Sequence, residues 1–261
     1  MAKRKVWLTA LGEAGPQANT FVQTLGKVGL DVVGAKWNDD AQQFPWSVLG
    51  VELSTGEKTD AWVIVVTSAA LTSKPDRYAL SLAAAVAEDL RGAPLPIFVV
   101  GLTTAPKAEE LPPGLRSAVL LSARESSWGA KVVAGLARPR GVSKQDYRFS
   151  ALGFPGLGQW YEVGPRNETW QGAMFGVPAG VDITHHGVGQ RSHLPERCVL
   201  NYPIAGMSVE IRGTPYTAWA VQNPISSEES YFIRVIGMPE NVFFGGHPGT
   251  DQSEVNVITL I

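Results

Sequence analysis

The sequence predicts an α/β domain with a doubly wound, five-stranded parallel sheet, followed by an all-β domain that forms an antiparallel sandwich or barrel. Strand and helix patterns alternate over residues 5–135, which is typical of repeated β-α units with helices on both faces of a sheet. After Gly141, Pro and Gly become frequent and short β-branched and aromatic runs replace the helical patterns. We therefore place the two domains at residues 1–140 and 145–261, with a linker at Arg138–Lys144.

The first β-α unit is predicted from the first 30 residues. KVWLTAL (5–11) is a short β-rich run that ends at Gly12, and a helical pattern follows at 18–30. The apolar residues of this helix share one face: Phe21, Val22, Leu25, Val28 and Leu30. DVVGAKW (31–37) predicts the second strand.

Three further strands are predicted from runs that are apolar almost without interruption. These runs are WVIVV (62–66), PLPIFVVGL (94–102) and SAVLLS (117–122). Strands of a parallel sheet show this composition because helices bury both of their faces. The sheet therefore has five predicted strands.

Two more helices are predicted between and after these strands. Residues 77–92 are rich in Ala and Leu, and Gly92 is suited to end the helix. Residues 128–137 form the other helix, which Ser126 or Ser127 is placed to cap.

The segment between the second and third strands, residues 38–60, contains no good helical pattern. Its apolar centre is compatible with an extra short strand at 48–53. We interpret the segment as a loop that is available to a partner.

The second half of the chain predicts about eight short strands over residues 147–261. Each is a short run of β-branched and aromatic residues. The runs are YRFSALGF, QWYEV, WQGAMFGV, CVLNYPI, MSVEIRG, YTAWAVQ, YFIRVIG and VNVITLI.

Charge and composition exclude several classes of function. A formal charge of −2 provides no broad positive field, so we expect no nucleic-acid partner. Cys198 is the single cysteine, which excludes an intramolecular disulfide and a multi-cysteine zinc site. No stretch approaches the roughly 20 apolar residues of a membrane helix, and the apolar run near the start is too short for a signal-peptide core. We expect a cytoplasmic protein without a membrane partner.

A ligand of an open α/β sheet binds in the crevice beyond the carboxyl ends of the strands. Side chains that directly follow the first three strands are the candidates, and Trp37 among them is suited either to stack on a base or to pack in the core. The ligand-binding candidates are Leu11, Gly12, Trp37, Asn38, Thr67 and Ser68.

Known cofactor and metal motifs give little support for chemistry elsewhere. No G-x-x-x-x-G-K-[ST] or G-x-S-x-G motif occurs, which excludes a P-loop and argues against a serine hydrolase. His185 and His193 are a weak alternative metal pair, because neutral imidazole binds zinc or iron. Their spacing is poor, so we expect no metal and no cofactor.

Four features of the first half match one known family. VWLTAL aligns with the first strand of that family, and Gly29-Leu30 aligns with the end of the family's first helix. Phe44-Pro45-Trp46 lies where a loop of the family carries x-P-G. VIVVTSAALTSKPDRYALSLA is the fourth and best match, to the third strand and the helix after it. On these residues the first 140 positions resemble a TIR (Toll/interleukin-1 receptor) domain, a flavodoxin-like α/β module of signalling and bacterial immunity.

The TIR resemblance bears directly on catalysis. The family signature V-V-x-L-S-x-x-Y-x-x-S-x-W-C-x-x-E-L aligns with Ser68, Ser73 and Leu80, whereas Pro75-Asp76 replaces Trp-Cys and Ala79 replaces the glutamate. The resemblance implies that this glutamate cleaves NAD in enzymatic members by stabilising cationic charge on the sugar. A methyl group cannot do so.

We therefore interpret the chain as a non-catalytic recognition or assembly protein of bacterial signalling or defence that senses a nucleotide-like ligand. TIR-like modules associate with one another, so we expect a homo-oligomer or a protein partner, with contacts through residues 38–60. Two alternatives stay open. One is an NAD glycohydrolase that uses Asp76 or Glu88 as a displaced carboxylate, and the other is a structural component of a larger assembly.

Overall fold

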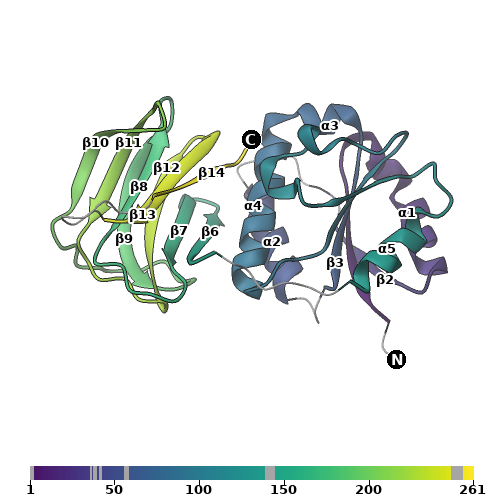
Figure 1. Ribbon diagram of the computed structural model, residues 1–261, viewed down its shortest axis with the longest axis horizontal. Helices are drawn as coiled ribbons and strands as arrows, with labels where there is room; N and C mark the ends of the chain where they lie inside the picture. The colour runs from purple at the N-terminus through teal and green to yellow at the C-terminus, as the bar shows by residue number, and fades with distance from the viewer. Residues whose placement is uncertain are drawn as a thin grey trace. The chain divides into compact units, whose positions relative to one another are not determined.

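The computed structural model describes residues 3–35, 37, 40, 43–55, 59–138, 145–247 and 255–261. The chain divides into two compact units, Met1–Ser143 and Lys144–Ile261, and each unit is described by itself (Figure 1). Of the expected linker, Arg138 alone belongs to the described residues.

The first unit is built on a parallel sheet, as predicted. Its described strands are β1 (Lys5–Ala10), β2 (Asp31–Gly34), β3 (Ala61–Val66), β4 (Ile97–Gly101) and β5 (Val119–Ser122). They lie in the order β2-β1-β3-β4-β5, and each neighbouring pair is parallel. This is the order of flavodoxin-like, doubly wound sheets. The central strand β3 is buried along its whole length, which agrees with its unbroken apolar sequence.

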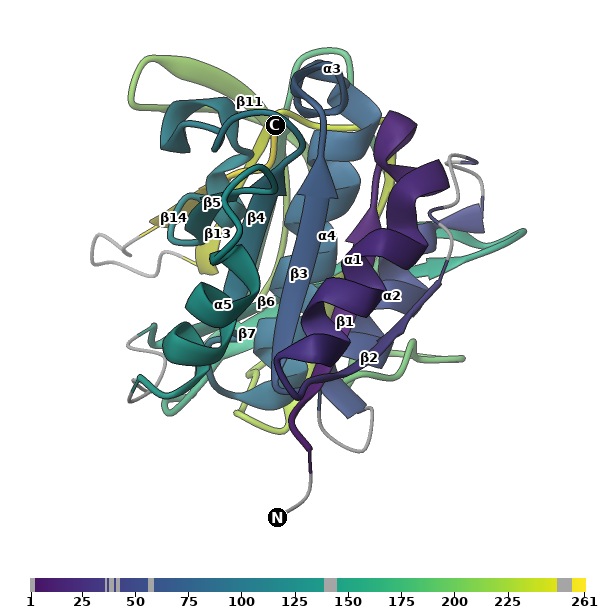
Figure 2. The ribbon, with the colours of Figure 1, turned by 90° about the vertical axis from the view of Figure 1, so that its right-hand side faces the viewer.

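Helices cover both faces of the sheet (Figure 2). The helical segments of the described residues are η1 (Gly12–Gln17), α1 (Ala18–Lys27), α2 (Pro45–Thr55), α3 (Ser68–Thr72), α4 (Lys74–Arg91), η3 (Ala108–Glu110), η4 (Pro113–Leu115) and α5 (Trp128–Leu136). Helices α1 and α5 share one face, where the rings of Phe21 and Trp128 meet edge to face at 6.2 Å. Helices α2 and α4 cover the other face.

The first helix and second strand are shorter than predicted. Helix α1 ends at Lys27, and β2 ends at Gly34. Phe21 is buried as expected, but Val22 and Val28 are 38% and 37% exposed. The buried stripe of this short helix is narrow, so Val22 lies beside it rather than within it.

Residues 45–55 form a helix, α2, so the predicted loop with a strand at 48–53 was wrong. Pro45 opens the helix, where its missing N–H costs no hydrogen bond. Helix α2 approaches α4 so closely that a Cβ placed on Gly50 would lie 2.6 Å from Cβ of Val86. This packing outweighs the weak helix propensity of the valines and the glycine in α2.

Helix α4 carries its own start and stop signals. The Ser73 hydroxyl accepts a hydrogen bond from the backbone N–H of Asp76 at 3.4 Å, which caps the first turn. Gly92 ends the helix at φ 64°, the left-handed conformation that glycine adopts without strain. Ser127 precedes α5, but its side chain makes no capping bond, contrary to the prediction.

The second unit is a sandwich of two antiparallel sheets. Its described strands are β6 (Tyr147–Phe154), β7 (Gly158–Pro165), β8 (Ala173–Pro178), β9 (Asp182–Gln190), β10 (Ile204–Ile211), β11 (Thr214–Val221), β12 (Glu229–Ile236), β13 (Asn241–Gly246) and β14 (Val255–Thr259). The strand orders are β10-β11-β8-β13-β14 and β6-β7-β12-β9. Phe149 stacks on Phe244 at 5.4 Å and Tyr161 meets Phe175 at 5.3 Å, so these side chains face inward between the sheets.

Candidate functional site

The sheet of the first unit has its switch point between β1 and β3, where the strand order reverses direction. The chain leaves β1 through Leu11 and Gly12 and leaves β3 through Thr67. The backbone N–H of Leu11 donates to the carbonyl of Val65 at 3.0 Å. A Cβ placed on Gly12 would lie 3.8 Å from Oγ1 of Thr67. The structure therefore brings the predicted residues Gly12 and Thr67 together at the carboxyl ends of the strands.

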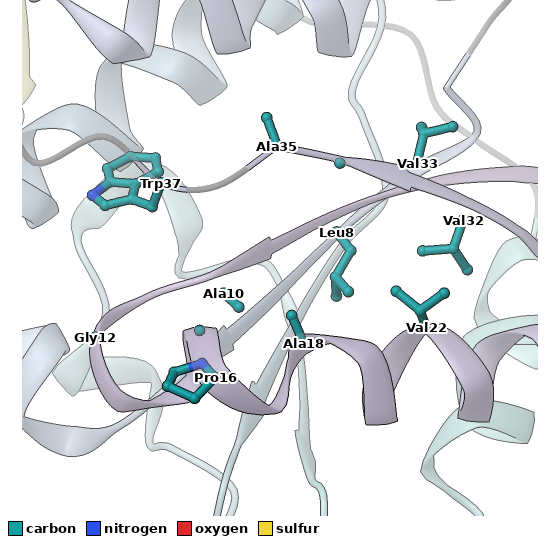
Figure 3. Close-up of a pocket in the computed structure, with 12 residues that line it drawn as sticks. Leu8, Ala10, Gly12, Pro16, Ala18, Val22, Val32, Val33, Ala35 and Trp37 are labelled. Atoms are coloured by element: carbon teal, nitrogen blue, oxygen red, sulfur yellow. The ribbon is translucent and has the colours of Figure 1, made fainter.

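An open cavity of about 840 Å³ lies between β1, β2 and the start of α1, and we call it the β1–β2 cavity (Figure 3). Its lining is small and apolar, with Trp37 at one end (Figure 3). None of these lining residues carries a titratable side chain. They are Leu8, Ala10, Gly12, Gly15, Pro16, Ala18, Val22, Val32, Val33, Gly34, Ala35 and Trp37.

A second cavity, of about 500 Å³, lies on the opposite face of the sheet. Trp7 and Thr9 line it, whereas Leu8 and Ala10 line the β1–β2 cavity, because successive side chains of β1 point to opposite faces. The two cavities share Ala35 and Trp37, just beyond the edge strand β2. Trp37 is therefore a wall of both cavities.

The indole N–H of Trp37 donates to Oδ1 of Asp76 at 3.0 Å, and both side chains are partly buried. Asp76 lies in the first turn of α4, where the positive end of the helix dipole favours a carboxylate. The sequence assigns Trp37 to ring stacking and Asp76 to catalysis in place of the missing glutamate. The structure shows that these two side chains are hydrogen-bonded to each other. Asn38 lies outside the described residues.

A third cavity, of about 520 Å³, lies at the carboxyl ends of β3 and β4 and is called here the β3–β4 cavity. Thr67 and Ser68 line it as predicted residues, and Thr67 also caps α3 by accepting from the N–H of Ala70 at 3.2 Å. Thr103 and Lys107 line it too, and sequence reasoning missed them. The signal was present for Thr103, which follows the buried strand IFVVG closely, as Thr67 follows β3. Lys107 lies further along the loop, and no strand-end signal marks it.

Arg77 holds the loop after β4 in place next to this cavity. Its guanidinium donates to the carbonyls of Leu71 at 3.0 Å, Glu110 at 2.6 Å and Leu111 at 3.2 Å. Burial, with a smaller effect of the Arg116 charge, lowers the pKa of Arg77. The loop that carries Lys107 is thereby tied to the start of α4.

The remaining acidic candidate and the alanine both lie on α4. Ala79 is buried, with 7% of its surface exposed. Glu88 follows Asp76 by three turns, which places it about 18 Å further along the helix axis, away from the carboxyl ends of the strands. The structure thus brings Asp76, but not Glu88, near the crevice.

The histidines of the second unit are dispersed. His185 lies beside Trp160, with ring centroids 6.4 Å apart, and Nδ1 of His193 donates to the carbonyl of Arg191 at 2.9 Å. His186 points the other way, into the sandwich, where its ring meets Trp219 at 4.9 Å. Within the described residues, no group of three or more His, Cys, Asp or Glu side chains is arranged to hold a metal ion.

None of the described helices is both long enough and apolar enough to span a membrane.

Comparison with known proteins does not assign the chain to a family. No family model matches the chain, and no curated protein matches it. Among solved structures, the crystal structure of NADH-dependent butanol dehydrogenase A from Thermotoga maritima matches with 21% identity and a TM-score of 0.29. The match covers 41% of this chain and 29% of the dehydrogenase, so it spans less than a third of that protein and carries no inference about activity.

Proposed function

We propose that the chain is a non-catalytic, TIR-like recognition or assembly protein of bacterial signalling or defence. Its first unit binds a nucleotide-like ligand at the carboxyl ends of the strands and releases it unchanged. The observation that carries this proposal is the β1–β2 cavity, whose described lining holds no titratable side chain. General acid–base chemistry needs such a group within hydrogen-bond reach of the reacting atoms, and stabilisation of a cationic sugar needs an anionic one.

The positions around Asp76 support the same conclusion. Ala79, which aligns with the TIR glutamate, offers a buried methyl group. The Asp76 carboxylate is engaged by the indole N–H of Trp37, so one of its oxygens already has a donor. The bond engages Oδ1 only, so the enzymatic alternative needs its own test.

The cavities suggest how a nucleotide-like ligand would divide its contacts. A flat base fits the small apolar lining of the β1–β2 cavity and the indole of Trp37. Hydroxyl and phosphate groups fit the β3–β4 cavity, which offers Thr67, Ser68, Thr103 and the cation of Lys107. The carboxylate of Glu110 also lines this cavity, and it accepts a hydrogen bond from the backbone N–H of Lys107 at 2.8 Å. Gly12 lies between the two, because it lines the first cavity and lies close to Thr67.

Isothermal titration calorimetry with adenosine, AMP and NAD tests this proposal. We expect saturable binding of at least one of them, and a loss of at least tenfold in affinity in Val22→Trp, whose indole would fill the β1–β2 cavity. Val28→Trp is the matched control: Val28 directly follows the same helix as its C-cap residue and is equally exposed, at 37% against 38%, but does not line the cavity. Unchanged affinity in Val22→Trp, or no binding of any of the three compounds, would contradict the proposal.

A glycohydrolase remains the rival because Asp76 lies at the crevice end of α4. Incubation of the protein with NAD, followed by chromatography of nicotinamide, separates the two functions. We expect no protein-dependent release. Release that Asp76→Ala abolishes, while Glu88→Ala leaves it intact, would establish the enzyme instead.

A further inference from the structure

A row of four side chains crosses the sheet β6-β7-β12-β9 of the sandwich. Leu152 pairs with Trp160, Trp160 with Arg234, and Arg234 with His185. Residues paired across antiparallel strands point to the same face. The neighbouring residues Tyr161 and His186 contact the opposite sheet, so this row points outward.

Arg234 is half-buried, yet its guanidinium makes no hydrogen bond or ion pair with the described part of the chain. Arg148, on the same face of the same sheet, is by contrast 2% exposed and fully engaged by its neighbours. It donates to the carbonyl of Pro165 and the hydroxyl of Ser230, each at 3.0 Å, and lies 3.8 Å from the Glu162 carboxylate. A planar guanidinium carries five donors and no acceptor, so Arg234 has donors available to an external partner.

Asp182 provides the complementary charge one row away. It pairs with Ile236, two residues beyond Arg234 on β12, so it lies on the same outward face. Its exposed carboxylate also makes no hydrogen bond or ion pair with any residue that the structure describes. The face thus carries one cation and one anion that do not bond to each other.

Large apolar side chains gather at this end of the sandwich. Phe154 and Leu157 belong to the β6–β7 hairpin and are 40% and 58% exposed, while Ile236 and Met238 at the end of β12 are 56% and 43% exposed. Aromatic residues, Met and Arg are the types enriched in protein–protein interfaces. Neighbouring exposed apolar residues of this kind mark an interaction surface.

The geometry points to a two-fold interface between two copies of this chain. We name its surface the sandwich-end patch: Phe154, Leu157, Ile236 and Met238 with Arg234 and Asp182. In a two-fold dimer the same patch meets itself, so Arg234 of each copy pairs with Asp182 of the other. The four apolar side chains then pack against their equivalents and exclude water from both ion pairs.

The charges favour a second copy over an unrelated partner. A partner that offers a carboxylate to Arg234 would also bring that charge close to Asp182, and like charges at an interface are unfavourable. A second copy related by a two-fold axis places its Asp182 opposite Arg234 and its Arg234 opposite Asp182, so both charges meet the opposite sign. This interface lies in the second unit and does not depend on ligand binding in the first unit.

Sedimentation velocity of the full chain between about 1 and about 200 µM tests the proposal, because small interfaces associate in this range. We expect a concentration-dependent dimer. Arg234→Glu and Asp182→Arg should each weaken it at least about tenfold, because each places like charges opposite one another twice. The double variant Arg234→Glu/Asp182→Arg exchanges the charges and should recover the wild-type dissociation constant within about threefold. Arg212→Glu, at an exposed position of the turn between β10 and β11, is the control and should dimerise normally.

Ile236→Ser gives an independent arm, since it removes apolar contact without changing charge, and it should also weaken the dimer at least about tenfold. Circular dichroism checks that each variant is folded. Three outcomes overturn the proposal: a wild-type chain that stays monomeric up to the highest concentration, single variants that dimerise normally, or a charge-swapped double variant that stays as weak as the single variants. Each differs from a failure of the ligand proposal, which Val22→Trp tests in the first unit.

Discussion

Trp37 donates its indole N–H to the carboxylate of Asp76 at 3.0 Å, across 39 positions of the sequence. The bond ties the segment beyond the edge strand β2 to the first turn of α4. Because Trp37 lines two cavities on opposite faces of the sheet, the bond also fixes the wall between them. The two residues therefore shape the candidate site as a pair.

Trp37→Phe tests the strength of this bond, because it keeps an aromatic ring and removes the donor. Hydrogen bonds to charged groups contribute about 1.5–3 kcal/mol, so we expect the free energy of unfolding to fall by about 1–2 kcal/mol for this partly buried pair. Urea denaturation followed by circular dichroism measures the change. Trp7→Phe is the control, since the Trp7 indole makes no hydrogen bond with the described residues. Equal losses in both variants would show that ring size, not the bond, decides stability.

Ala79→Glu tests the interpretation of the replaced glutamate. Ala79 is buried in α4, so a carboxylate there would lose its hydration without a designed partner. We expect a loss of about 2–4 kcal/mol in unfolding free energy and no release of nicotinamide from NAD. The half-exposed Ala85 of the same helix provides the control, and Ala85→Glu should cost under about 1 kcal/mol. A stable Ala79→Glu protein that cleaves NAD would show that this position opens onto the ligand.

The parallel sheet could be predicted because the apolar composition of its strands indicates burial on both faces. WVIVV is apolar at every position, and β3 is buried at every residue. Helix α2 could not be predicted, because its valines and Gly50 favour other conformations locally. Its stability comes from contact with α4 at Val86, which lies 36 positions later and leaves no trace in the local pattern.

Some contacts of the candidate site could be predicted from the sequence, and others could not. Gly12 and Thr67 could be found because residues that follow parallel strands meet at one edge of the sheet. The bond between Trp37 and Asp76 could not, since it depends on the path of the chain after β2 and on the register of α4. Thr103 was missed although the rule that found Thr67 also applies after β4.

Substitution by alanine should change the free energy of unfolding in opposite directions at Gly50 and Gly26. A Cβ on Gly50 would lie 2.6 Å from the side chain of Val86, so Gly50→Ala forces α2 away from α4 and should cost about 1–3 kcal/mol. Gly26 lies within α1 and a Cβ there meets nothing within 4 Å, so Gly26→Ala should gain about 0.5–1 kcal/mol. Urea midpoints of the two variants measure both effects. Stabilisation of both variants would mean that α2 and α4 do not pack this closely.

The titration of His186 should make the free energy of unfolding depend on pH. Its Nδ1 and the hydroxyl of Tyr231 are 2.8 Å apart inside the sandwich, and its ring meets the edge of Trp219. Burial lowers the pKa of His186 from its ordinary 6.5 and raises the pKa of Tyr231. The folded chain therefore favours a neutral His186.

The unfolded chain binds a proton at this histidine near pH 6.5, whereas the folded chain does so at lower pH, so the contribution of neutral His186 is complete above pH 6.5 and declines as the pH falls below it. Urea unfolding between pH 8 and pH 5 should show a smaller decline for His186→Gln than for the wild type. His193→Gln, at an exposed position, should retain the wild-type decline. Identical pH profiles for wild type and His186→Gln would mean that the imidazole is as well hydrated in the folded sandwich as in the unfolded chain.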